Sequence, residues 1–212
     1  RHQNKLMFGS DCNCSDGRGT GTERAAPRMR GKCVARETLT VLANATTAGR
    51  YTKAGSGTQT LTSANTYTGT TTVNGGVLNL AASQTIKIGN ALVVNSGATV
   101  NLAAAGDAIR DLAIITLNGG TLADTTATAG HNHAILLSAG RTLNMQNGAS
   151  ILGTGAAAGH ANYGQIYLGT GTTTINVTGT PASTWNADIR WGSTSGATTI
   201  NIDAGSTLIV AG

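Results

Sequence analysis

Residues 53–80 read KAGSGTQTLTSANTYTGTTTVNGGVLNL, and this stretch decides the fold. Apolar and polar residues alternate from Leu61 onward and again over residues 73–80, and residues 65–69 separate the two runs. Alternation with a period of two predicts strands with one buried and one wetted face. The separating segment is rich in Asn, Thr and Gly, which predicts a turn between the strands.

A triplet of apolar residue, asparagine and apolar residue recurs beyond this stretch. Its copies are Leu78-Asn79-Leu80, Val100-Asn101-Leu102, Leu143-Asn144-Met145, Ile175-Asn176-Val177 and Ile200-Asn201-Ile202, with a degenerate copy at Leu122-Ala123-Asp124. The centres are 22, 22, 21, 32 and 25 residues apart. A glycine precedes each copy, at Gly76, Gly97, Gly120, Gly140, Gly171 and Gly196. A period of this size indicates a repeat architecture, in which the longest step carries an inserted loop.

These observations predict an all-β fold, a right-handed parallel β-helix over residues 53–212. The chain shows no helical period, and its two prolines lie outside the triplets. The apolar members of the triplets are expected to face inward and the asparagines outward, because successive strand side chains alternate.

Residues 1–52 form a second, basic segment that we expect to be poorly structured. They hold Cys12, Cys14 and Cys33, and they carry the whole formal net charge of +5. A basic run of this kind is able to contact nucleic acid or acidic lipid, but a solvated segment is the simpler interpretation. No aromatic residues are interleaved with the basic ones for base stacking, so no nucleic-acid partner is expected. The cysteine spacing is too tight for a structural zinc site, so no metal is expected either.

Residues 53–80 closely resemble the autotransporter-associated β-strand repeat of bacterial surface passenger domains. The resemblance covers the Gly-x-Gly-Thr start, the Ala-Asn-Thr-Tyr-Thr-Gly centre and the Gly-Gly-x-Leu-x-Leu end. It implies a structural or adhesive segment of an exported protein, a stiff stalk or display surface with a glycan or host-cell partner. It also implies a monomer at the cell surface, attached to the outer membrane by a barrel beyond residue 212. The sequence shows no apolar run of 18 residues and no signal peptide, so we expect an internal fragment of a longer protein.

Residues 5–12, KLMFGSDC, resemble the last barrel strand of amidohydrolase-type metal-dependent hydrolases. The resemblance implies that Asp11 stands where that family has a metal-site or base aspartate. The seven earlier strands and their histidine ligands are missing, so residues 1–45 would be a fusion remnant without activity.

A polysaccharide-binding or polysaccharide-degrading β-helix is the alternative function. Glycoside hydrolysis needs two carboxylates about 5 to 10 Å apart. The acids of the repeat region are Asp107, Asp111, Asp124, Asp188 and Asp203, and none forms a clustered pair on adjacent predicted coils. His131 and His133 share a strand face but lack a carboxylate beside them. We therefore expect no enzyme, no catalytic residues and no cofactor.

Binding without catalysis needs only exposed rings and amides. The aromatic residues of the two irregular steps are Tyr163, Tyr167, Trp185 and Trp191. Insertions of a solenoid lie on loops and carry function, so these four residues form the predicted ligand site.

Overall fold

The computed structural model describes residues 39–41, 50–65, 67–83, 86, 91–104, 109–110, 112–124, 135–137, 140–153, 166–168, 171–186, 189–191 and 197–210. The chain divides into a unit of Arg1–Arg36, which lies outside the described residues, and a unit of Glu37–Gly212 that holds every described element. All of these elements are strands.

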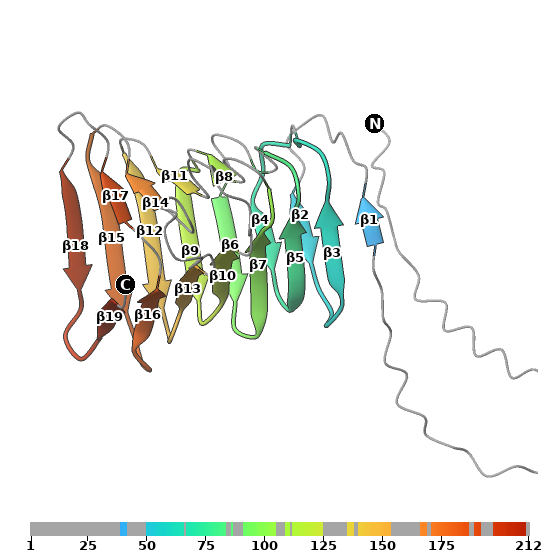
Figure 1. The fold of residues 1–212 in the computed structure, drawn as a ribbon. Coiled ribbons are helices and arrows are strands. Elements are labelled where there is room, and N and C mark those ends of the chain that lie inside the picture. Colours follow the sequence, from blue (N-terminus) through green and yellow to red (C-terminus); the bar gives the residue numbers. More distant parts are fainter. Residues whose placement is uncertain are drawn as a thin grey trace, which may run out of the picture. The chain divides into compact units, whose positions relative to one another are not determined.

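Three sheets make up the Glu37–Gly212 unit (Figure 1). The eight-strand sheet contains, in spatial order, β1 (Leu39–Val41), β3 (Thr58–Leu61), β5 (Gly76–Leu80), β7 (Ala98–Leu102), β10 (Thr121–Asp124), β13 (Ser150–Gly153), β16 (Ser183–Asn186) and β19 (Leu208–Val210). The seven-strand sheet contains β2 (Tyr51–Lys53), β4 (Thr71–Val73), β6 (Ala91–Asn95), β9 (Ile114–Asn118), β12 (Arg141–Gln146), β15 (Thr173–Thr178) and β18 (Thr198–Ile202). The four-strand sheet contains β8 (Ile109–Arg110), β11 (Ile135–Leu137), β14 (Ile166–Leu168) and β17 (Ile189–Trp191).

From β6 onward the chain visits these sheets in a fixed cycle. It runs through β12 in the seven-strand sheet, turns a corner into β13 of the eight-strand sheet, and returns by β14 of the four-strand sheet to β15. The strands in each sheet pair in parallel, so each turn of the cycle is one coil stacked on the previous coil. The parallel β-helix predicted from the sequence is confirmed.

The core is the space that the coils enclose. Eight of the ten apolar residues predicted to face inward are at most 3% exposed: Leu78, Leu80, Val100, Leu102, Leu143, Met145, Ile175 and Val177. Ile200 and Ile202 pair in register with Ile175 and Val177 and therefore face the same side of the sheet, but they are 48% and 51% exposed. They belong to β18, the edge strand of its sheet, so no further described strand covers their side.

The triplets do not form one column, which corrects the simplest interpretation of their spacing. Asn79 and Asn101 pair in the eight-strand sheet, whereas Asn144 and Asn176 pair in the seven-strand sheet. Ala123, at the centre of the degenerate copy, pairs with Leu152. The two arms of a coil have the same alternation, so spacing alone does not tell which arm a triplet occupies.

The β-helix also begins before residue 53. The strand β1 pairs with β3, and β2 pairs with β4 from Tyr51 onward. Leu39–Val41, the strand β1, lies within the segment expected to be poorly structured.

The corner between β4 and β5 requires glycine. Gly76 has a φ of +64°, and a Cβ at this position would lie 2.6 Å from the carbonyl oxygen of Gly55. Gly97, at the next corner, has a φ of +76° but nothing within 4 Å of such a Cβ. Left-handed backbone favours glycine at both corners, and close packing adds a second reason at Gly76.

Candidate functional site

Of the four aromatic residues predicted to bind a ligand, the structure describes three, and these belong to two different sheets. Tyr163 lies outside the described residues. Tyr167 and Trp191 belong to β14 and β17, which are neighbours in the four-strand sheet. Trp185 belongs to β16 in the eight-strand sheet.

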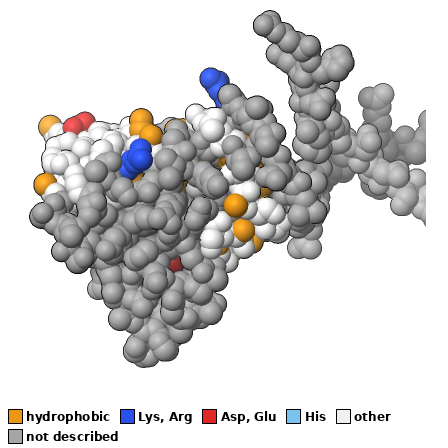
Figure 2. Space-filling view, turned by 90° about the horizontal axis from the view of Figure 1, so that it is seen from above, with side chains coloured by type: hydrophobic (Ala, Val, Ile, Leu, Met, Phe, Trp, Pro, Cys, Tyr) orange, Lys and Arg blue, Asp and Glu red, His pale blue; other side chains and the backbone are white. Residues whose placement is uncertain are grey.

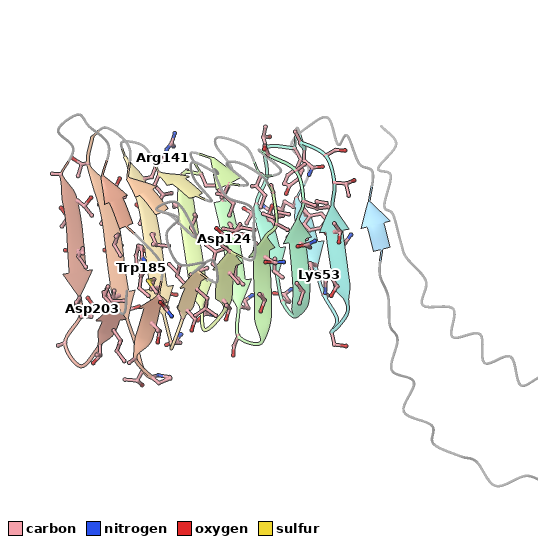
Figure 3. All side chains as sticks on the ribbon, viewed as in Figure 1. Lys53, Asp124, Arg141, Trp185 and Asp203 are labelled. Atoms are coloured by element: carbon pink, nitrogen blue, oxygen red, sulfur yellow. The ribbon has the colours of Figure 1, made fainter. Side chains whose placement is uncertain are left out.

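Trp185 is part of the core (Figure 3). Its side chain is 1% exposed, and its register neighbours are Ile151 and Val210. Stacking on an outside ligand needs an exposed ring face, which Trp185 does not present. This corrects the expectation for Trp185, because Ser183 and Trp185 form the inward set of the alternation in β16.

The two remaining described aromatic candidates, Tyr167 and Trp191, belong to neighbouring strands of the four-strand sheet, and we call this pair the Tyr167–Trp191 strip. Tyr167 pairs with Arg190, and Trp191 pairs with Leu168. Leu168 pairs in turn with Leu137, which is fully buried. Ligand binding by Tyr163, Tyr167 and Trp191 stays a prediction.

The described acids do not form a carboxylate pair. Asp124 is 7% exposed at the end of β10, and its register neighbours are Leu102 and Gly153 rather than a residue of the Asn144 strand. Asp203 is exposed and follows β18, several coils away along the stack (Figure 3).

The other titratable candidates, Asp11, Asp107, Asp111, Asp188, His131, His133 and the three cysteines, lie outside the described residues. Among the residues that the structure describes, no group of three or more His, Cys, Asp or Glu is able to hold a metal ion. The same residues contain no helix long and apolar enough to cross a membrane.

The structure instead assembles a polar cluster inside the first coils, which we call the first-coil cluster: Tyr51, Lys53, Tyr67 and Thr71. The rings of Tyr51 and Tyr67 stack with centroids 6.2 Å apart. The hydroxyl of Tyr67 is hydrogen-bonded to Oγ1 of Thr71 at 2.6 Å, and the hydroxyl of Tyr51 is buried without a partner. Burial raises the pKa of both phenols; the charge of Tyr67 adds to the rise at Tyr51, and the Thr71 bond opposes it at Tyr67.

Lys53 places an ammonium group where the other coils have an apolar side chain. It pairs with Val73 in the sheet and is 4% exposed (Figure 3). Its Nζ donates to the carbonyl oxygens of Gly55 and Gly75 at 2.8 Å and of Ala54 at 3.2 Å. Burial lowers the pKa of this ammonium. The three carbonyls come from two successive corner turns, so Lys53 ties the first two coils together.

The first-coil cluster has little catalytic capacity in this arrangement. A phenol with a raised pKa stays protonated near neutral pH, and an ammonium surrounded by three carbonyls has used its three donors. Within the cluster, Lys53 and the Tyr67–Thr71 pair have their polar groups hydrogen-bonded, whereas the Tyr51 hydroxyl does not. Sequence analysis missed the cluster because Lys53 reads as a surface residue until its register with Val73 is known.

Three ladders of amide side chains run along the outside of the stack. Asn101 donates to Asn79 on the eight-strand sheet. On the seven-strand sheet, Asn201 donates to Asn176, Asn176 to Asn144, and Asn144 to Thr116, at 2.9, 2.9 and 3.2 Å. The corner ladder, defined as Asn74, Asn95, Asn118 and Asn147, follows the turns between these sheets. On the face seen in Figure 2, charged side chains are few among the described residues, and most of the described surface is backbone or uncharged side chains.

Residues 52–80 match the family model described as passenger-associated-transport-repeat. This segment covers the strands β3, β4 and β5 and most of the first-coil cluster. No curated protein and no solved structure matches the chain, and the likeness of residues 5–12 to amidohydrolases gains no support.

Proposed function

We propose that this chain is a stiff, non-catalytic segment of an exported, autotransporter-like surface passenger. The transport repeat at residues 52–80 carries the proposal, because the structure builds that repeat as the first coils of a parallel β-helix. The later coils continue the same stack in register, so the repeat and the remainder form one continuous rod of paired strands.

Its outer surface suits a solvated stalk. The amide ladders occupy the outward positions, where they satisfy one another between coils and leave the remaining donors to water. Described charged side chains are few on the stack, so it attracts neither anionic nor cationic polymers by charge alone. An adhesive role toward a glycan or a host-cell partner is the finer form of the proposal, with the Tyr167–Trp191 strip as its site.

Surface display tests the main proposal. The full chain is placed between a secretion signal and an outer-membrane barrel, and intact cells are treated with an external protease. We expect the chain to reach the surface as a folded domain that resists the protease. Gly76→Val, which forces a side chain onto the Gly55 carbonyl inside the transport repeat, should reduce display.

The matched control is Gly97→Val, at a corner with free space and outside residues 52–80. Equal display of both variants, or retention of the unaltered chain inside the cell, would count against the proposal. A glycan array then tests the adhesive form, with Trp191→Ala compared to the unaltered chain. Binding that survives this change would exclude the strip as the site.

A further inference from the structure

The corner ladder combines two features with a chemical consequence. Asn95 donates its amide to Asn74 at 2.7 Å, Asn118 donates to Asn95 at 3.3 Å, and Asn147 donates to Asn118 at 2.7 Å. Three of these four residues, Asn74, Asn118 and Asn147, are followed directly by glycine. The ladder therefore aligns three Asn-Gly sequences along one edge of the stack.

An Asn-Gly sequence is open to spontaneous deamidation. The backbone nitrogen of the glycine attacks Cγ of the asparagine, a new C–N bond closes a succinimide ring, and Nδ2 leaves as ammonia with the displaced proton. Water then opens the ring to aspartate or isoaspartate. Glycine permits the attack because it has no Cβ to obstruct the approach.

The hydrogen bonds of the fold treat the three sites differently. At Asn118 the nucleophile is occupied, because the N–H of Gly119 donates to the carbonyl oxygen of Gln146 at 2.8 Å. Asn118 also both donates and accepts within the ladder, and its side chain is only partly exposed.

Asn74 and Asn147 are the two ends of the ladder, and both are exposed. Each has only one ladder bond, and within the described part of the chain the N–H groups of Gly75 and Gly148 donate to no acceptor. We propose that Asn74 and Asn147 are sites of covalent deamidation in the folded protein, whereas Asn118 is protected.

The direction of the hydrogen bonds in the ladder means that aspartate at position 147 breaks a bond between coils, whereas aspartate at position 74 keeps its bond. Asn74 only accepts, through Oδ1, and an aspartate there still accepts from Asn95. Asn147 donates through Nδ2 to Oδ1 of Asn118. An aspartate at position 147 has no proton to donate, so it replaces that bond with a carboxylate facing an amide oxygen. Conversion of Asn147 to aspartate therefore weakens the contact between two coils, and conversion of Asn74 to aspartate does not.

Peptide mapping by mass spectrometry tests the selectivity. The full chain is incubated in mildly alkaline buffer, folded and in urea, and the three sites are followed over time. In the folded protein we expect Asn118 to react about 30-fold more slowly than Asn74 and Asn147. Asn118 must lose two hydrogen bonds that the other sites lack, the bond from the Gly119 N–H and one additional ladder bond. In urea the three sites should react at similar rates. Equal rates in the folded protein, or reaction at Asn74 and Asn147 only in urea, would overturn the proposal.

Two variants test the directional effect without waiting for the reaction. Asn147→Asp should lower the folding equilibrium constant by about fivefold, as loss of one net hydrogen bond predicts, and shift the urea midpoint down. Asn74→Asp introduces the same charge at a position that is also exposed and should leave the midpoint unchanged. Equal shifts for the two variants would refute the directional argument.

Discussion

Nδ2 of Asn176 donates to Oδ1 of Asn144 at 2.9 Å across 32 residues of sequence, and Nδ2 of Asn201 donates to Oδ1 of Asn176 at the same distance across 25. The geometry of the ladder is therefore independent of the length of the coil. Extra residues in a long coil are accommodated between the paired strands, whose register stays aligned. The repeat unit of this fold is set by strand pairing rather than by a constant residue count.

Removal of one complete coil should consequently be tolerated. Deletion of residues 145–176 joins Asn144 to Val177 and preserves both the alternation and the corner that follows. We expect this variant to keep cooperative urea unfolding with a smaller slope, because less surface is exposed on unfolding. Deletion of residues 145–160, which breaks the register, is the control and should abolish the cooperative transition. Similar urea unfolding of the two deletion variants would contradict the idea that a complete coil is the unit of this fold.

The corner glycines should differ in their tolerance of a side chain. Gly97→Ala should cost about 1–2 kcal/mol, the penalty of left-handed backbone for an L-residue. Gly76→Ala carries the same penalty, and its Cβ also meets the carbonyl oxygens of Gly55 and Gly57. It should therefore cost about 1–3 kcal/mol more, as overpacking does. Urea unfolding of the two variants measures the difference, and equal losses would show that the backbone at Gly76 relaxes freely.

The two stacked tyrosines should respond oppositely to loss of the hydroxyl. Tyr51→Phe removes a buried hydroxyl that has no partner, so stability at neutral pH should stay constant or rise by about 1 kcal/mol. Tyr67→Phe removes the partner of the buried Thr71 hydroxyl and should cost about 1–2 kcal/mol. Thermal unfolding of both variants is the measurement. Destabilisation by Tyr51→Phe would indicate that its hydroxyl has a partner after all.

Stability should fall in alkaline solution through the same two residues. Burial raises the pKa of Tyr51 and Tyr67 above their ordinary value of 10.0, so above about pH 10 the unfolded chain loses protons that the folded protein keeps. The lowered pKa of Lys53 acts in the opposite sense, and only below its ordinary value of 10.5. The free energy of unfolding should therefore decrease with pH above about 10.5, and less steeply in Tyr51→Phe. If the free energy of unfolding falls equally steeply with pH in Tyr51→Phe, groups other than Tyr51 cause the loss of stability above pH 10.5.

The sequence by itself determined the class of fold and the inward face of most triplets. Alternation of Leu78, Asn79 and Leu80 and its recurrence require paired strands with one buried side, whatever sheet they join. The left-handed corner at Gly76 falls in the Gly75-Gly76 pair that precedes the triplet in the sequence. These properties are local, because a side chain's direction along a strand depends only on its neighbours in the chain.

The tertiary structure alone decided the rest. Which arm of a coil holds a triplet depends on strand pairing, and burial depends on the coil above. Ile200 is therefore exposed although its register neighbour Ile175 is buried. Trp185 lies in the core rather than on a binding surface, and Lys53 is buried, because stacked coils supply the apolar contacts and the carbonyl groups that surround these side chains. A one-dimensional pattern specifies the face of a strand, but contacts between coils come from residues 20 or more positions away in the chain.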